Sequence, residues 1–155
     1  MTALGLLTAI TLLDQWTKLA VRRGFALGES VPVWPGFFHL TYLRNTGAAW
    51  GVLGGQNTAL ILLSIAMLAL MLRYRRHFLA DTASHRIALG LLLGGITGNL
   101  LDRVRLGYVV DFLDFFAGPH HWPAFNVADA AICCGVGLYL LTSWRGPDAA
   151  NAAKK

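Results

Sequence analysis

The chain is patterned as four long apolar runs separated by more polar connections. The runs cover about residues 2–21, 57–72, 87–103 and 125–144. A helix needs about 17–25 residues, most of them apolar, to cross a bilayer, so these lengths favour four membrane-spanning helices. The first run has no basic segment before it and contains Asp14, so we expect a retained helix and not a signal peptide that is removed.

Two segments in the connections have the composition of β-strands. Residues 38–43 are rich in aromatic and β-favouring side chains, with proline and glycine on both sides. Residues 108–115 have a similar composition and are a candidate to join the same sheet. We therefore expect a small extracytoplasmic β-region over about residues 31–55 and 108–115.

The composition agrees with a membrane protein. Hydrophobic residues make up 55% of the chain and charged residues only 14%, whereas an ordinary soluble domain carries about 25% charged residues. The predicted fold class is therefore an all-α membrane protein with four transmembrane helices and a small extracytoplasmic β-region. We expect residues 1–155 to form a single domain, with a disordered tail at residues 147–155.

The net charge of +5 is better explained by membrane topology than by a nucleic-acid-binding surface. Most Lys and Arg residues lie at the ends of the apolar runs, and a nucleic-acid site would gather them on one face. Four arginines lie between residues 73 and 86, which favours a cytoplasmic position for this loop and for both termini. Arg22 and Arg23 are exceptions, because this orientation puts them on the outer side.

The two cysteines are neighbours in the last apolar run. Cys133 and Cys134 have no other cysteine in the chain with which to pair, which excludes a disulfide framework and a cysteine-based zinc site. A free cysteine packs as a small hydrophobic residue, so we expect both to be buried.

Five of the eight acidic residues lie in or beside the apolar runs. They are Asp14, Asp102, Asp111, Asp114 and Asp129. A carboxylate in hydrocarbon costs several kcal/mol, so such a residue is a candidate for function, although a single one is as often a structural partner between helices. Counted along the predicted helices, four of the five approach one depth near the outer face of the membrane, and this convergence favours a site.

The spacing of polar residues brings them to shared helix faces. Asn99 and Asp102 are three residues apart, as are Asn126 and Asp129, so each pair projects from one side of its helix. We expect these two sides to face each other. Asp14 and Lys18, four residues apart, are expected to form a structural ion pair.

Two carboxylates held close together favour one kind of hydrolysis. Because both do not ionise easily, the pair shares a proton. The ionised member can deprotonate a water molecule while the protonated member polarises a carbonyl, as in aspartic proteases. No serine lies in a nucleophile-elbow pattern and no His-Glu-x-x-His motif is present. Asp114 lies on the opposite strand face from Asp111, so we expect it to be solvated or structural.

Five segments together resemble the lipoprotein signal peptidase family, also called signal peptidase II, over nearly the whole chain. The segments are Leu13-Asp14-Gln15-Trp16-Thr17-Lys18, Arg44-Asn45-Thr46-Gly47-Ala48-Ala49-Trp50-Gly51, Gly98-Asn99-Leu100-Leu101-Asp102-Arg103, Val109-Val110-Asp111-Phe112 and Phe125-Asn126-Val127-Ala128-Asp129. Each is weak alone, but their order and separations are specific.

The resemblance implies both a site and a substrate. The catalytic aspartates of the family fall on Asp111 and Asp129, and its supporting polar residues fall on Asp14, Asn45, Asn99, Asp102, Arg103 and Asn126. The implied substrate is a diacylglyceryl-modified prolipoprotein, cut just before the lipidated cysteine near the outer face of the bacterial cytoplasmic membrane. The family uses no metal or organic cofactor, is inhibited by globomycin-type cyclic peptides and acts in contact with membrane lipid, and no nucleic acid is involved.

Two other functions also use carboxylates within a membrane. A metal-dependent transferase acting on lipid head groups would hold Mg²⁺ or Mn²⁺ with three or more of them. A transporter would spread its carboxylates through the bilayer and break helices near the midplane. The run from Leu60 to Leu72 has no acidic residue, proline or glycine, which argues against a transporter.

Overall fold

Four helices and one antiparallel sheet form the part of the chain that the computed structural model describes, residues 2–48, 52–75 and 82–144. The helices are α1 (Ala3–Gly24), α2 (Asn57–Arg73), α4 (Ala83–Leu106) and α5 (Val127–Trp144). The strands are β1 (Ser30–Trp34), β2 (Phe38–Asn45), β3 (Val109–Ala117) and β4 (His120–His121).

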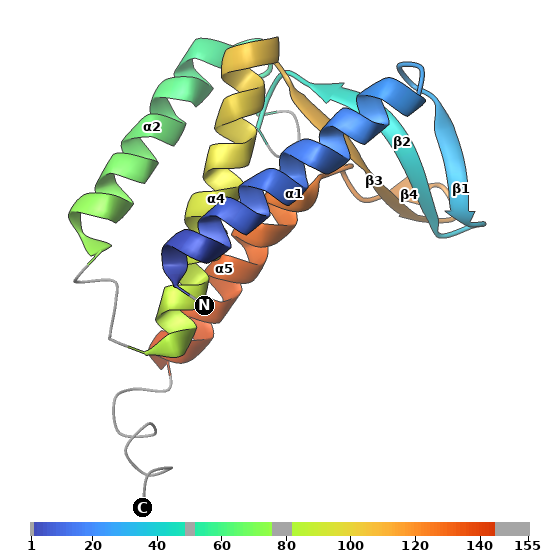
Figure 1. Cartoon of the computed structure of the whole chain (residues 1–155). Helices are drawn as coiled ribbons and strands as arrows, with labels where there is room; N and C mark the ends of the chain where they lie inside the picture. Colours follow the sequence, from blue (N-terminus) through green and yellow to red (C-terminus); the bar gives the residue numbers. More distant parts are fainter. Residues whose placement is uncertain (1, 49–51, 76–81, 145–155) are drawn as a thin grey trace, which may run out of the picture.

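Helix α4 is the centre of the helical part, since it contacts α1, α2 and α5. Figure 1 shows α4 and α5 running side by side, with α1 crossing them and α2 leaning away on the other side of α4. The sheet lies beside the end of the molecule where α1 and α4 finish. This arrangement brings the last turns of α1 and α4, the start of α5 and the sheet to one region.

Glycines on α4 allow its neighbours to come close. A Cβ atom at Gly94 would lie 2.9 Å from the Cβ of Ile10 on α1. A Cβ atom at Gly95 would meet the backbone carbonyl oxygen of Ala128 on α5. Because a side chain at either position would push a helix away, these glycines set the distances within the helical part.

The sheet has the strand order β1-β2-β3-β4, with every neighbouring pair antiparallel. Gly107 ends α4 in the left-handed conformation, with φ of 80°, which glycine adopts without strain. Strand β3 begins two residues later at Val109, which pairs with Asn45 on β2. The short turn therefore fixes β3 and its carboxylates close to the end of α4.

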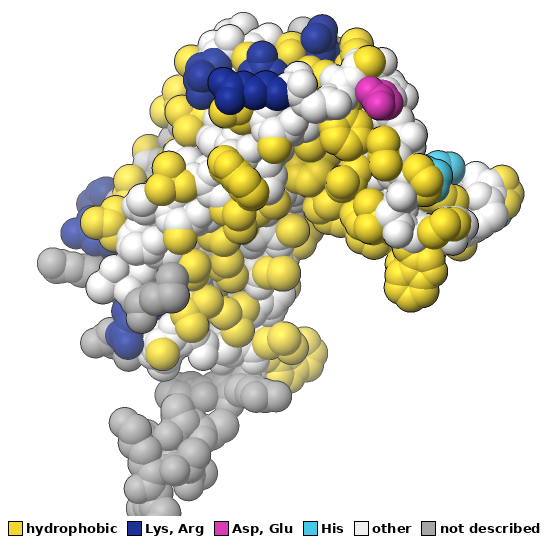
Figure 2. Space-filling view, turned by 45° about the vertical axis from the view of Figure 1, so that its right-hand side comes forward, with side chains coloured by type: hydrophobic (Ala, Val, Ile, Leu, Met, Phe, Trp, Pro, Cys, Tyr) yellow, Lys and Arg dark blue, Asp and Glu magenta, His cyan; other side chains and the backbone are white. Residues whose placement is uncertain are grey.

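A small hydrophobic core joins α1 to the sheet, while the outer faces of the helices are apolar and exposed. The core consists of Val21, Tyr42, Val110 and Phe112. On the outside, large hydrophobic side chains such as Trp16, 67% exposed, have no protein covering them, and Figure 2 shows hydrophobic side chains over much of one face. Such a surface suits a lipid environment.

The predicted fold class, an all-α membrane protein with four transmembrane helices, is wrong. Within the described residues only α4 and α5 are long and apolar enough to cross a membrane, and a four-stranded sheet accompanies the helices. Helix α1 carries Asp14, Lys18 and Arg22 within its length, and α2 is 17 residues long. Helix α1 is long enough to span a membrane, but the polar side chains that it uses for contacts inside the protein lower its mean hydropathy.

The expectation that both cysteines are buried is also wrong. Cys133 and Cys134 are exposed on α5, with free thiols. The other elements cover only one side of α5, where its buried residues Ala128, Ala131 and Gly135 lie, and the cysteines are not on that side. The predicted disordered tail at residues 147–155 lies outside the described residues.

Replacing Gly95 by alanine should destabilise the protein by about 1–3 kcal/mol, because the added methyl group would overlap the carbonyl of Ala128 on α5. Gly137 offers a matched control on the neighbouring helix, since a Cβ atom there meets nothing within 4 Å. Thermal unfolding in detergent should show a lower Tm for Gly95→Ala and no loss for Gly137→Ala. Equal melting temperatures for the two variants would contradict the close packing of α4 on α5.

Candidate active site

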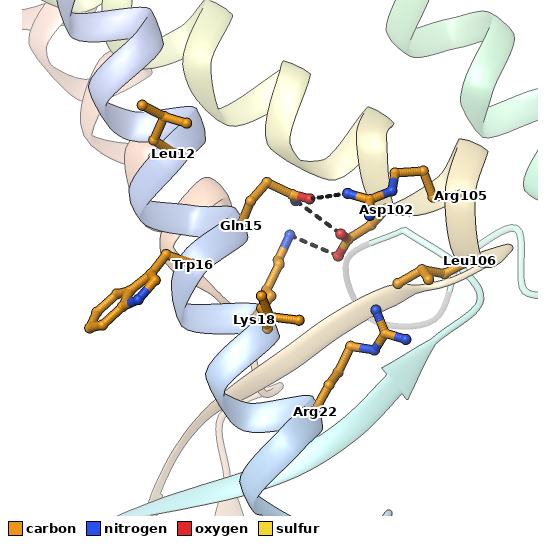
Figure 3. Close-up of a pocket in the computed structure, with 9 residues that line it drawn as sticks. Leu12, Gln15, Trp16, Lys18, Arg22, Asp102, Arg105 and Leu106 are labelled. Atoms are coloured by element: carbon orange, nitrogen blue, oxygen red, sulfur yellow. Dashed lines mark hydrogen bonds and ion pairs between the residues drawn. The ribbon is translucent and has the colours of Figure 1, made fainter.

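A buried ammonium group lies at the meeting point of α1 and α4. The side chain of Lys18 is only 2% exposed. Its Nζ atom is 2.9 Å from Asp14 Oδ2, 3.1 Å from Asp102 Oδ2 and 3.0 Å from Asn99 Oδ1. An ammonium group has three hydrogens to donate, so these three contacts satisfy it fully. Figure 3 shows Lys18 extending from α1 toward Asp102 on α4.

The two carboxylates that pair with Lys18 connect it to two further elements. Asp14 Oδ1 accepts a hydrogen bond of 2.9 Å from the backbone N–H of Ala128, at the start of α5. Asp102 Oδ2 accepts one of 3.1 Å from the backbone N–H of Val110 on β3. One ion cluster thereby holds α1, α4, α5 and β3 together.

Asn99 carries the network from Lys18 to Asp129. Its side-chain oxygen accepts from Lys18, and its amide nitrogen donates a hydrogen bond of 2.7 Å to Asp129 Oδ1. Asn126 also donates to the Asn99 oxygen, at 3.3 Å. The predicted facing of the Asn99 side of α4 toward the Asn126 and Asp129 pair is therefore confirmed.

Asn126 and Asp129 form a reciprocal cap at the start of α5. Asn126 Oδ1 accepts from the backbone N–H of Asp129 at 3.0 Å, and Asp129 Oδ2 accepts from the backbone N–H of Asn126 at 3.3 Å. This is the geometry of a capping box, with aspartate in the place of the usual glutamate. The cap therefore fixes the orientation of Asp129 at the start of α5.

Asp111 on β3 receives one side-chain amide at each carboxylate oxygen. Asn126 Nδ2 donates to Oδ1 at 2.7 Å and Asn45 Nδ2 donates to Oδ2 at 2.9 Å. Burial, together with the negative charge of nearby Asp129, raises the pKa of Asp111 to about 7. The hydrogen bonds from Asn45 and Asn126 oppose this rise. Asn126 thus contacts both carboxylates and links β3 to α5.

Arg103 supports the loop that follows β2. Its guanidinium donates a hydrogen bond of 3.1 Å to the backbone oxygen of Gly47, and the Gly47 N–H donates to Asn45 Oδ1 at 2.9 Å. The positive charge of Arg103 is close enough to act on Asp111 and Asp129. Arg103 therefore holds the segment that carries Asn45 against the two carboxylates.

Asp114 lies apart from this group. Its Oδ2 accepts from the hydroxyl of Thr41 at 3.2 Å, and its Oδ1 is 2.9 Å from Nδ1 of His121, which is exposed. Asp111 instead contacts Asn45 and Asn126. The two carboxyl groups of β3 have separate partners, as the alternation of a strand predicts.

The structure brings together all eight residues that the sequence analysis named: Asp14, Asn45, Asn99, Asp102, Arg103, Asp111, Asn126 and Asp129. Two contributors were missed. Lys18 was expected to pair with Asp14 alone, and Gln15, which donates to Asp102 Oδ1 at 3.0 Å, was given no role. The spacing of four between Asp14 and Lys18 was the only signal in the sequence, and it does not reveal partners on another helix.

This arrangement offers a buried carboxyl group, Asp111, and a partly buried one, Asp129, both of which accept hydrogen bonds from Asn126, the first from its side chain and the second from its backbone N–H. With its pKa raised to about 7, Asp111 is partly protonated near neutral pH, while Asp129 accepts hydrogen bonds from Asn99 and from the cap of α5. Such a pair can take a proton from water and give one to another group. Within the described residues no group of three or more His, Cys, Asp or Glu side chains is placed to hold a metal ion.

The chain is similar to proteins of one family over most of its length. A sequence model of the family described as Signal peptidase (SPase) II matches residues 6–145. The lipoprotein signal peptidase of Syntrophotalea carbinolica is 48% identical over 142 residues, which cover 89% of this chain and 88% of the relative. That of Geobacter metallireducens is 46% identical over 144 residues, covering 88% and 87%.

Solved structures agree with this relationship. One, titled as a bacterial membrane enzyme structure determined by the in meso method at 2.3 Å resolution, superposes with a TM-score of 0.84 at 32% identity. It covers 92% of this chain and 87% of the solved chain. A second with the same kind of title, at 1.9 Å resolution, has a TM-score of 0.79 and 33% identity.

Replacing Lys18 by methionine should destabilise the protein strongly, by about 3–5 kcal/mol, because Asp14 and Asp102 would keep buried charges without a cation. Arg23→Met is the matched control, since Arg23 is an exposed cation on the same helix. Thermal unfolding in detergent should show a large fall in Tm for Lys18→Met alone. A similar Tm in both variants would mean that the ion cluster does not hold the helices and sheet together.

Proposed function

The chain belongs to the signal peptidase II family, and we propose that it is an aspartyl endopeptidase that removes the signal peptide from diacylglyceryl-modified prolipoproteins. It cuts the peptide bond just before the lipidated cysteine. The observation that carries this proposal is the pair of carboxyl groups of Asp111 on β3 and Asp129 on the apolar helix α5, which accept hydrogen bonds from the side chain and from the backbone N–H of Asn126. The family is a membrane protein family, and the two apolar helices α4 and α5 fit that setting.

The proposed reaction needs one shared proton. The ionised carboxylate accepts a proton from a water molecule, whose oxygen attacks the scissile carbonyl carbon. The protonated carboxyl group donates a hydrogen bond, and then its proton, to the carbonyl oxygen. When the tetrahedral intermediate collapses, the carbon–nitrogen bond breaks and the proton taken from water passes to the leaving amine. The former carbonyl oxygen re-forms its double bond and returns its proton to the carboxyl group that donated it, so the pair again holds one proton.

We assign the starting proton to Asp111 and the role of base to Asp129. Burial raises the pKa of Asp111 to about 7, so it keeps a proton near neutral pH. The carboxylate of Asp129 accepts hydrogen bonds from Asn99 and from the backbone N–H of Asn126. With the proton on Asp111, Asp129 is the member of the pair left to act as the base.

The remaining residues have positioning roles in this proposal. Asn126 and Asn45 orient the carboxyl group of Asp111, and Asn99 orients that of Asp129. Asp14, Asp102 and Arg103 fix the elements around the pair. The chain acts as a single integral membrane domain, without a metal or organic cofactor, near the outer face of the bacterial cytoplasmic membrane. Globomycin-type cyclic peptides are the inhibitors to expect.

A metal-dependent transferase is less well supported. It needs three or more carboxylates around an ion, but Asp14 and Asp102 are already paired with Lys18 at 2.9 and 3.1 Å. Among the described residues of this region, Asp111 and Asp129 are then the carboxylates left to bind a cation.

Cleavage of a purified diacylglyceryl-modified prolipoprotein, in detergent with EDTA present, tests the assignment of the pair. Asp111→Asn and Asp129→Asn should each lower kcat by roughly 10²–10⁴-fold, because each removes a group that transfers a proton. Asp114→Asn is the matched control on the same strand, with its own partners Thr41 and His121, and it should cleave like the wild type.

Two outcomes would reject this mechanism. Cleavage by a folded Asp111 or Asp129 variant at the wild-type rate would show that the pair is misassigned. Wild-type activity that appears only after Mg²⁺ is added to EDTA-treated protein would favour the metal-dependent alternative.

The pH dependence of cleavage follows from the pKa of Asp111. Burial and the charge of Asp129 raise it from 3.8 to about 7, so the pair holds its shared proton below about pH 7 and loses it above. We expect kcat/KM to fall about tenfold per pH unit on the alkaline side. The raised pKa also stabilises the folded state at low pH, and this contribution is lost as the pH rises through 7.

Initial rates between pH 5 and 9, with folding checked at each pH, measure this profile. Asp114→Asn should have the same alkaline limb as the wild type. A rate that stays constant up to pH 9 would show that no proton on Asp111 is needed.

A further inference from the structure

A groove of about 290 Å³ lies between α1 and α4, on a part of the surface that the proposed reaction does not use. Its apolar wall is formed by Leu12, Trp16, Leu19 and Leu106. Arg22, in the last turn of α1, and Arg105, in the last turn of α4, also line it. Asp111 and Asp129 are not among its lining residues. The groove is therefore separate from the proposed catalytic pair.

The two arginines are available to a ligand. Among the described residues Arg22 makes no hydrogen bond or ion pair, and Arg105 makes one long hydrogen bond of 3.5 Å to Gln15 Oε1. Figure 3 shows the Arg105 side chain extending from α4 toward Gln15 on α1, and the Arg22 side chain extending from α1 toward Leu106 and α4. Two cations from different helices that lack a carboxylate partner and point into the same groove form a site for an anion.

The carboxylate nearest to this groove does not neutralise the arginines. Asp102 lines the groove, but its oxygens accept from Lys18, Gln15 and the N–H of Val110. Lys18 with Asp14 and Asp102 carries a net charge of −1, and the two arginines carry +2, so the groove keeps an overall charge of +1. The positive part is at its rim, where the guanidinium groups are exposed.

The position of these arginines also needs an explanation other than topology. Arg22 ran against the orientation that the basic residues of the 73–86 loop favour. Figure 2 shows Lys and Arg side chains gathered at the upper end of the molecule, above a hydrophobic surface. For a membrane protein, a basic group directly above exposed apolar side chains lies at the depth of lipid phosphates.

We propose that this groove binds an anionic phospholipid. The phosphate lies between Arg22 and Arg105, because planar guanidinium groups match phosphate oxygens in pairs. An acyl chain lies along Leu12, Trp16 and Leu19, which are 65%, 67% and 40% exposed. A lipid with a neutral head group satisfies the apolar wall but gains less from the positive rim, so the site prefers a net negative lipid.

The test compares two lipids with the same acyl chains, phosphatidylglycerol and phosphatidylcholine. The purified protein in mild detergent is titrated with each lipid, and bound lipid is counted by native mass spectrometry. We expect roughly tenfold tighter binding of phosphatidylglycerol to the wild type, because basic side chains near a membrane surface each favour anionic lipid. This comparison needs no variant, so it remains decisive if a variant folds poorly.

The double variant Arg22→Gln/Arg105→Gln should lose this preference. The control Arg23→Gln/Arg75→Gln removes the same charge from exposed positions outside the groove and should keep it. Equal binding of the two lipids by the wild type, or an equal loss in both double variants, would overturn the proposal.

Inorganic phosphate distinguishes a lipid from a free anion. At millimolar concentration it should not displace phosphatidylglycerol, because it makes no contact with the apolar wall. Displacement by inorganic phosphate alone would show that the arginines bind phosphate without use of that wall, and the lipid assignment would be rejected.

Discussion

The buried ammonium group of Lys18 is the contact on which the rest of the structure depends. A cation taken out of water is stable in a protein interior only if charged or polar groups surround it. Here Asp14, Asp102 and Asn99 supply three acceptors within 3.1 Å. These acceptors in turn contact two further elements: Asp14 and Asn99 reach Ala128 and Asp129 on α5, and Asp102 reaches β3. The need to satisfy one charge thereby fixes the relative positions of every element around the candidate site.

Asn126 joins this scaffold to the two carboxylates, and its chemistry explains why an amide stands there. Its oxygen caps α5 by accepting from the N–H of Asp129, while its nitrogen donates to Asp111 at 2.7 Å. A carboxylate in its place has no proton to donate to Asp111 and adds a third negative charge. An amide instead provides one donor and one acceptor without charge. The start of a helix and the carboxylate of a strand are therefore held at a fixed separation by one neutral side chain.

The sequence predicted which polar residues lie close together better than it predicted the fold class. Apolar length identified the helices, and β-favouring composition identified the strand segments. The i, i+3 spacing of Asn99 and Asp102 predicted which side of α4 faces the start of α5. The four-span class failed because a hydrophobic run was read as a lipid-facing helix, whereas the polar side chains of α1 point inward to Asp102 and Asn99. The capping box was missed as well, since α5 begins at Val127 and not at Phe125. Partners on other elements, such as those of Lys18, do not follow from spacing along one helix.

The charges near the candidate pair balance in a way that suits acid–base chemistry. Asp14 and Asp102 contribute −2, and Lys18 and Arg103 contribute +2, so the four supporting charges cancel. With one shared proton, Asp111 and Asp129 then carry the only net charge of the cluster, −1. In a region of low dielectric a second negative charge would be costly, because the four supporting charges already sum to zero. The scaffold thus resists loss of the shared proton from the pair, and burial raises the pKa of Asp111 for the same reason. A pair that holds one proton in this way suits the acid–base chemistry that we propose for it.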